Sequence, residues 1–244
     1  MIQTKNNFLF VEIQSNELID KGLINELLDE KITGILFKNF LSSNEVLSIK
    51  NNVSKIPLSK KTIINEGFST YPISFAQFSQ MMENNLMTIE DYIKIAEDLI
   101  QNQTIDLGVN ITQKLIDFLI NNNLFQNIGP IIEPTSSKPL VPFNIRELFP
   151  GNGELVVHCE NLFFKEFPNF FNWLKIMDIK DNKLSYFITI QKPNEGGELC
   201  CYDLHWDDVN NRDTHTILKG KSGELYNINS NDISKFLINP DEGD

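Results

Sequence analysis

Hydrophobic residues change their spacing about halfway along the chain. In the first half they recur three or four positions apart, as on one face of a helix. Residues 17–29 and 111–124 are the clearest examples, and residues 33–37 are a short run rich in β-branched side chains that predicts a strand. The apolar positions expected on the face of the first helix are Leu18, Leu23, Leu27 and Leu28. We therefore expect region 1–130 to be mainly helical.

Two hydroxyl residues predict where further helices begin. Ser43 precedes the apolar positions Val46, Leu47 and Ile49, and its hydroxyl is suited to cap a helix there. Thr88 is followed by two acidic residues, which favour the positive end of a helix dipole. Both positions are predicted helix starts.

A proline-rich loop at 129–142 separates this region from one in which the hydrophobic residues have the shorter spacing of strands. The predicted strands are residues 154–158, 184–191 and 198–206, and the last two are joined by a turn at 193–197 in which Gly196 and Gly197 tolerate positive φ. Short strands joined by turns are typical of a sandwich or jelly roll. We expect one α+β domain over residues 1–244, with a jelly-roll core over 143–244 and the N-terminal helices packed outside it.

Composition narrows the functional classes. With 41% hydrophobic residues the chain can bury a sizeable core, and its formal net charge of -12 argues against nucleic acid and anionic membranes as partners. Three cysteines, two of them adjacent, do not suggest a disulfide framework, so a reducing, cytoplasmic compartment is expected. Neither a signal peptide nor an apolar run of membrane-spanning length is recognisable.

The first chemical motif is His158-Cys159-Glu160. On a strand, alternate side chains share a face, so His158 and Glu160 would point together and Cys159 away. An imidazole and a carboxylate on one face are two ligands of the facial triad that suits Fe(II). The spacing alone is also explained by a surface pair at a strand end.

The surrounding sequence resembles the Fe(II)/2-oxoglutarate oxygenases, in particular the subgroup of freestanding aliphatic halogenases and hydroxylases of N-substituted amino acids. The resemblance extends over residues 144–206 and is weaker over 34–53. The segments that carry it are, in order, residues 144–149, 155–161, 184–188 and 195–199, then Tyr202 and Trp206.

The resemblance implies roles for both residues of the motif. His158 would be the first iron ligand. Glu160 falls where hydroxylases of the family have a carboxylate and halogenases have a small residue that leaves room for chloride. The resemblance therefore implies hydroxylation of an aliphatic carbon of a small molecule at an Fe(II) centre, in a reaction that consumes 2-oxoglutarate and O₂ and releases succinate and CO₂.

Three further residues are candidates for binding 2-oxoglutarate. Arg146 precedes the ligand strand, and its guanidinium could hold a carboxylate through two hydrogen bonds. A surface ion pair with Glu147 or Glu154 explains it equally well. Tyr186 and Thr189 could donate a hydroxyl, although packing within a strand also accounts for them.

The family's distal histidine and a later basic residue follow a Pro-x-x-Gly-Asp turn on a late strand. Residues 240–244 fit that turn, and no residue after it supplies either group. We therefore expect a barrel that is incomplete at its C-terminal edge, a fragment with two iron ligands, and poor solubility of the isolated chain. His205 and His215 are expected to be structural or surface residues, with His205 a minor candidate as a replacement ligand.

Other residue clusters have simpler explanations. Cys200 and Cys201 would point to opposite faces of a strand and pack as small apolar residues. The phenylalanine-rich segment 163–173 is expected in the core, with substrate-pocket lining as the lesser alternative. Asp207-Asp208 and the acidic residues of 241–244 are interpreted as solvated charge rather than a Ca²⁺ site.

Two other interpretations remain open at this point. One is a non-catalytic or degenerate jelly-roll protein, which the missing ligand favours; the other is a barrel completed by a second chain. The substrate, the position oxidised and the oligomeric state are not indicated by the sequence.

Overall fold

The computed structural model describes residues 2–5, 8–17, 19–64, 66–151, 155, 157–158, 167–177, 185–204, 218–219, 225–226 and 233–244. Its helices are α1 (Leu23–Leu28), α2 (Ser43–Val53), η1 (Leu58–Lys60), α3 (Phe75–Glu83), α4 (Ile89–Leu107), α5 (Ile111–Asn121) and α7 (Pro168–Ile176). Its strands are β1 (Ile2–Lys5), β2 (Phe8–Gln14), β3 (Gly34–Lys38), β4 (Thr62–Ile63), β5 (Phe68–Tyr71), β6 (Ile132–Glu133), β7 (Lys138–Pro139), β8 (Ile145–Leu148), β9 (Leu199–Tyr202), β10 (Leu218–Lys219), β11 (Leu225–Tyr226) and β12 (Lys235–Ile238).

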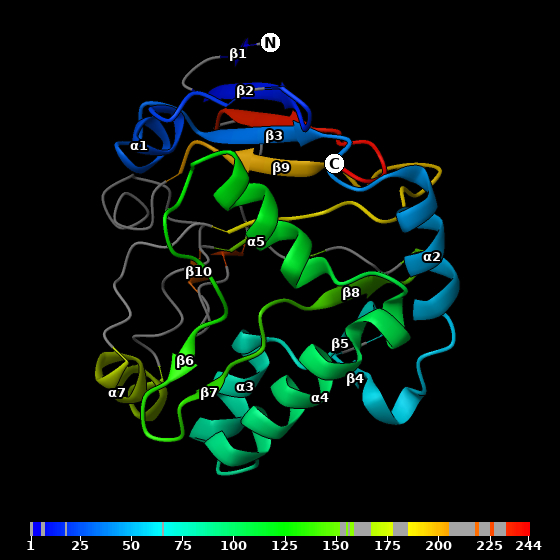
Figure 1. Ribbon diagram of the computed structural model, residues 1–244, viewed down its shortest axis with the longest axis vertical. Helices are drawn as coiled ribbons and strands as arrows, with labels where there is room; N and C mark the ends of the chain where they lie inside the picture. The colour runs from blue at the N-terminus through cyan, green and yellow to red at the C-terminus, as the bar shows by residue number, and fades with distance from the viewer. Residues whose placement is uncertain are drawn as a thin grey trace.

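A three-stranded sheet occupies the end of the molecule where both termini lie (Figure 1). β2 pairs antiparallel with β1 and parallel with β3. Because side chains alternate along a strand, Phe8 and Phe10 pack against Phe236 of β12, while Ile13 packs with α1 on the other face. Gly34 lies opposite Phe10, and a Cβ atom at Gly34 would come within 2.5 Å of the Phe10 ring. The missing side chain leaves room for that ring.

The helices α2, α3, α4 and α5 begin at side-chain caps that the sequence encodes. Thr88 caps α4 and forms a capping box with Asp91, as predicted. The cap of α2 is Ser42 rather than the predicted Ser43, since Ser42 accepts a hydrogen bond from the backbone N–H of Glu45. α2 and α4 pack in one apolar core with Ile49 and Leu99.

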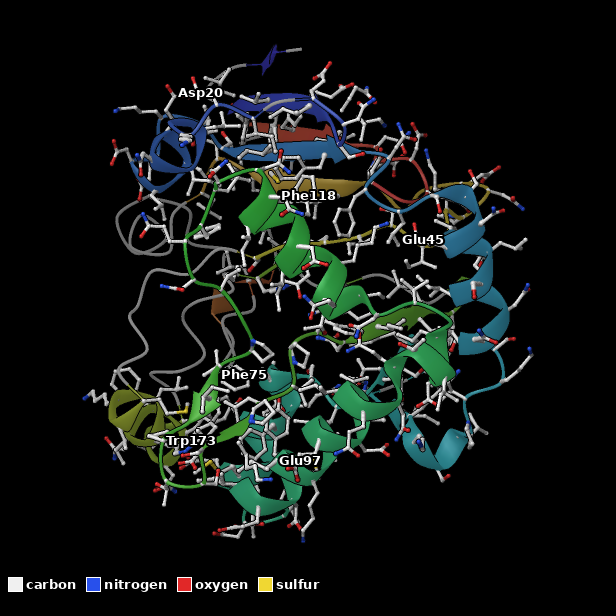
Figure 2. The ribbon with its side chains drawn as sticks, viewed as in Figure 1. Asp20, Glu45, Phe75, Glu97, Phe118 and Trp173 are labelled. Atoms are coloured by element: carbon white, nitrogen blue, oxygen red, sulfur yellow. The ribbon has the colours of Figure 1, made fainter. Side chains whose placement is uncertain are left out.

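A second core lies at the opposite end of the molecule, where α3, the start of α4 and α7 meet. Figure 2 labels two of its rings, Phe75 and Trp173, whose centroids are 6.4 Å apart. We call this group the aromatic–methionine cluster; its members used below are Phe75, Phe78, Tyr92, Phe170, Trp173, Met81, Met82, Met87 and Met177. The burial of Phe170 and Trp173 agrees with the predicted core role of the described part of segment 163–173.

The C-terminal residues fold back onto the body of the protein. Asp244 donates its backbone N–H to the carbonyl of Asp241 (3.1 Å), which confirms the predicted turn. Gly243 donates to the carbonyl of Thr189 (2.7 Å), and Thr189 donates to the carbonyl of Asp244 (3.0 Å). Gly243 and Asp244 therefore both pair with Thr189, as in a β-bulge whose first residue is a glycine in the left-handed conformation. Gly243 has the positive φ that such a bulge requires, 92°.

The interpretation of this acidic tail as solvated charge is wrong for Asp244. Its side chain is fully buried and forms an ion pair with Lys38. It also accepts hydrogen bonds from the backbone N–H groups of Asn39 (2.9 Å) and Asp241 (2.7 Å). Asp207 and Asp208 lie outside the described residues. A carboxylate with this many donors can be buried because its charge is paired and its oxygens are satisfied.

Several predicted elements differ from the observed ones. The first helix is shorter than 17–29, and Leu28 is exposed rather than on the buried face. The predicted loop 129–142 contains the hairpin β6–β7, and region 1–130 holds β1 to β5 besides its helices. The described residues 185–191 are not in a strand, so that prediction is wrong, whereas 33–37 and 198–206 are confirmed in β3 and in part in β9. Gly196 and Gly197 have the positive φ expected of their turn.

The fold class remains a prediction. Among the described residues the sheets have two or three strands and none closes into a barrel. In the same residues no helix combines the length and the apolar character needed to cross a membrane.

Candidate functional site

His158 is the described member of the proposed iron-binding pair. It lies in an isolated β-bridge and is exposed. The preceding residue, Val157, accepts a hydrogen bond from the backbone N–H of Leu225 at the start of β11 (2.7 Å). β11 therefore fixes the backbone next to the imidazole. Cys159 and Glu160 lie outside the described residues, and the shared face of His158 and Glu160 stays a prediction.

Arg146 lies in the middle of β8. Its register partner is Thr70 of β5, a residue that is 2% exposed. Adjacent side chains of a strand point to opposite faces, so Arg146 and Glu147 diverge. Glu147 forms an ion pair with Lys61 (2.9 Å), a different partner from the arginine suggested by the sequence. Glu154, the other suggested partner of Arg146, lies outside the described residues.

Tyr186 and Thr189 lie on the segment that pairs with the C-terminal turn. The hydroxyl of Tyr186 donates a hydrogen bond to the carbonyl of Pro142 (3.0 Å), three residues before β8 begins. Thr189 uses its backbone N–H and carbonyl to bind the C-terminal turn. The tyrosine thus ties this segment to the chain that leads into the Arg146 strand.

The chemistry of the donor set is compatible with iron, but the described residues do not assemble a complete site. An imidazole and a carboxylate two positions apart are ligands that Fe(II) accepts. Within the described ranges no group of three histidine, cysteine, aspartate or glutamate side chains converges on one point. Glu160, His205 and His215 fall outside those ranges.

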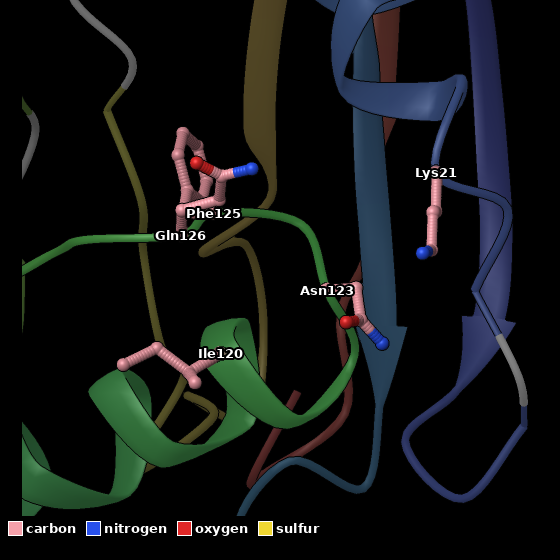
Figure 3. Close-up of a pocket in the computed structure, with 5 residues that line it drawn as sticks. All are labelled: Lys21, Ile120, Asn123, Phe125 and Gln126. Atoms are coloured by element: carbon pink, nitrogen blue, oxygen red, sulfur yellow. The ribbon is translucent and has the colours of Figure 1, made fainter.

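A surface hollow of about 350 Å³ lies elsewhere, between the end of α5 and the chain before α1 (Figure 3). Its lining is formed by Lys21, Ile120, Asn123, Phe125 and Gln126. Arg146, His158, Tyr186 and Thr189 are not among these residues. The hollow therefore contributes nothing to the assignment of the site.

Two features of the described structure were not predicted from the sequence. Lys38 holds the buried carboxylate of Asp244, which lies 206 positions later, and no local pattern connects residues so far apart. Tyr92 and Trp173 each bury a polar atom within the aromatic–methionine cluster. The sequence did not single out Tyr92, and Trp173 was expected only as part of the phenylalanine-rich core segment 163–173.

Comparison with known protein families identifies the chain. Residues 7–244 match the family described as carrier-protein-independent halogenase WelO5. No curated protein matches the chain. Because the family match covers nearly the whole sequence, the chain belongs to the carrier-protein-independent halogenase WelO5 family, a family of Fe(II)/2-oxoglutarate-dependent enzymes that act on free small molecules.

Proposed function

We propose that this protein is an Fe(II)/2-oxoglutarate-dependent oxygenase that hydroxylates an aliphatic carbon of a small molecule. The observation that carries the proposal is the carboxylate of Glu160, two positions after His158. A carboxylate at this position occupies the place on iron that a halide ion needs, as the resemblance to the family's hydroxylases implies. Halogenation is the second candidate, and the family description favours it.

His158 and Glu160 would hold the metal through an imidazole nitrogen and a carboxylate oxygen. When bound, Fe(II) and 2-oxoglutarate supply the O₂ chemistry that removes a hydrogen atom from carbon, with release of succinate and CO₂. Arg146 would bind a carboxylate of 2-oxoglutarate, and Tyr186 or Thr189 would offer it a hydroxyl. These residues would hold the metal, the keto acid and the substrate in the relative positions that the reaction requires.

The test uses the full chain, loaded without oxygen with Fe(II) and 2-oxoglutarate and then exposed to O₂ in the presence of chloride. Candidate substrates are amino-acid derivatives and secondary metabolites. We expect succinate release and a product that has gained one oxygen atom. A product in which chlorine replaces hydrogen would establish halogenation instead and refute the role given to Glu160.

Variants of Glu160 separate the two reactions. Glu160→Ala opens the position on iron, so we expect hydroxylation to fall and chlorination to become detectable. Glu160→Asp keeps a carboxylate and serves as the matched control, with hydroxylation retained. Binding is read independently from the visible absorption that appears when 2-oxoglutarate binds Fe(II) in the protein. His158→Ala should abolish that absorption, and its persistence would remove His158 from the metal site.

A further inference from the structure

Two buried hydrogen-bond donors in the aromatic–methionine cluster lack an acceptor. The hydroxyl of Tyr92 and the indole N–H of Trp173 have no hydrogen-bond partner in the described part of the chain. Tyr92 is 0% exposed and Trp173 is 5% exposed, so bulk water does not reach them readily. Folded proteins satisfy most buried polar atoms, and each exception calls for an explanation.

Both donors belong to rings that contact the same phenyl ring. Phe78 stacks on Tyr92 with centroids 4.1 Å apart and meets Trp173 edge-on at 5.6 Å. Phe75 also contacts both rings, at 6.2 and 6.4 Å. The two donors are therefore parts of one aromatic group, contributed by α4 and α7 around α3 (Figure 2).

The chemistry of the cluster restricts what it can bind. The members named above have aromatic or thioether side chains. Their hydrogen-bond donors are the Tyr92 hydroxyl and the Trp173 indole N–H. The two unpartnered donors, a hydroxyl and an indole N–H, are both neutral, so they offer no counter-charge for an ion. A neutral acceptor oxygen on an apolar body is the complementary chemistry.

The cluster also contains the chain's internal methionines. Met81, Met82, Met87 and Met177 all pack against it, and the remaining methionine is Met1. Methionine is flexible and polarizable, and it is used where a surface adapts to ligands of varying shape.

We propose that the α3–α4–α7 cluster binds a small neutral molecule with an apolar body and one acceptor oxygen, a ketone or ether, which accepts a hydrogen bond from the Tyr92 hydroxyl or the Trp173 indole N–H. None of Arg146, His158, Tyr186 and Thr189 is a member of the cluster. The inference therefore does not rest on the proposed oxygenase activity, and its test needs neither iron nor 2-oxoglutarate.

Tyr71 provides a matched control inside the same protein. It is also a buried tyrosine, but its hydroxyl donates to the carboxylate of Asp106 (2.6 Å). Replacing Tyr71 by phenylalanine removes a made hydrogen bond, whereas the same change at Tyr92 removes a hydroxyl that has no partner. The proposal thus predicts opposite effects on the thermal midpoint of the ligand-free protein.

The test combines unfolding with a binding measurement. Tyr92→Phe should raise the thermal midpoint of the full chain by about 2–4 °C, and Tyr71→Phe should lower it by a similar amount. Cyclohexanone is the probe, and methylenecyclohexane, which has the same shape without the oxygen, is its control. Binding is followed by the indole N–H resonance of Trp173 in the ¹⁵N-labelled full chain, assigned with Trp206→Phe because the chain has two tryptophans.

We expect cyclohexanone to shift that resonance saturably, methylenecyclohexane to bind more weakly, and Tyr92→Phe to weaken cyclohexanone binding by about 3- to 10-fold. Three results would overturn the proposal. One is the absence of a saturable shift with cyclohexanone. Another is equal affinity for cyclohexanone and methylenecyclohexane, or equal affinity of the unaltered protein and Tyr92→Phe for cyclohexanone. The third is a lower thermal midpoint for Tyr92→Phe, which would mean that the hydroxyl already has an internal partner such as water.

Discussion

Asp244 lies 206 positions after Lys38, and its buried carboxylate forms an ion pair with the Lys38 ammonium. Burial lowers the pKa of Lys38, but hydrogen bonds to Asp241 and Asp244 outweigh that effect and hold the pKa above its ordinary value. The lysine lies at the end of β3, so the pair joins the N-terminal sheet to the C-terminal turn. The turn is therefore part of the folded core rather than a loose tail.

The conformation of Gly243 is the first point to test. Its φ is 92°, and a Cβ atom there would lie 2.5 Å from the carbonyl oxygen of Leu41. Gly243→Ala should therefore lower the free energy of unfolding by about 2–3 kcal/mol. Gly151→Ala is the matched control, since Gly151 has φ of 82° but no atom within 4 Å of its Cβ position.

Gly151→Ala should lower the free energy of unfolding by about 1 kcal/mol, through backbone strain alone. Urea unfolding followed by circular dichroism measures both variants. If the two glycines prove equally tolerant, the close approach of the turn to Leu41 does not exist in solution.

A second prediction concerns the room that Gly34 leaves for Phe10. The Phe10 ring stacks on Phe236 with centroids 4.8 Å apart, so it has little freedom to move away from a new methyl group. Gly34→Ala should lower the free energy of unfolding by about 1–3 kcal/mol. Gly129→Ala, where no atom lies within 4 Å of the Cβ position, should have a much smaller effect. Similar midpoints in urea for the two variants would contradict the packing of β12 against β2.

Local signals predicted the start of α4 well and sheet partners poorly. Thr88 and Asp91 are three positions apart, and their capping box was recognisable because both partners are neighbours in the sequence. β2 was missed: its polar Glu12 and Gln14 alternate with apolar residues, but the paired β3 lies more than twenty positions away. Short-range patterns cannot specify which distant strand completes a sheet.

The candidate site follows the same rule. The spacing of His158 and Glu160 is local, so the sequence could single the pair out as candidate iron ligands. The family match supports Fe(II)/2-oxoglutarate-dependent chemistry for the chain, and the roles of the two residues stay predictions. Segment 185–191 has the composition of a strand, but its described hydrogen bonds are that of the Tyr186 hydroxyl and those of Thr189 with the C-terminal bulge. The composition of a segment shows that it can form a strand, but a strand also requires a second segment to which its backbone can hydrogen-bond.

The pH dependence of stability can be tested at Glu45. Burial raises the pKa of this carboxyl, but hydrogen bonds from Lys114 and Ser42 outweigh it and hold the pKa below its ordinary value of 4.5. The folded state therefore favours the ionised form. The resulting stabilisation is present above the unfolded pKa and is lost as the pH falls through the folded pKa.

Glu45→Gln isolates the charge, because glutamine can still cap a helix, as Gln77 does in α3. We expect Glu45→Gln to lower the free energy of unfolding by about 0.5–1 kcal/mol at pH 7, and by less below pH 4.5. A double-mutant cycle with Lys114→Gln, measured at both pH values, assigns the effect to the ion pair. A difference that persists unchanged in acid would show that the charge has no part in it.

The last prediction concerns Arg146. If its guanidinium holds a carboxylate of 2-oxoglutarate through two charged hydrogen bonds, Arg146→Ala should raise the dissociation constant for 2-oxoglutarate by about 10- to 100-fold. Arg146→Lys should recover part of the affinity, since an ammonium keeps the charge without the two-pronged geometry. The measurement is anaerobic titration of the Fe(II)-loaded chain, with circular dichroism to show that each variant is folded.

Arg212→Ala is the control for net charge, since Arg212 is the chain's other arginine. It should leave the dissociation constant unchanged. The position of Arg146 makes the test sharp, because Glu147 has its own partner in Lys61 and Arg146 lies on the opposite face of β8. An alanine variant that is folded and binds 2-oxoglutarate as tightly as the unaltered protein would restrict Arg146 to a structural role in the sheet and would move the search for the anchor to another cation.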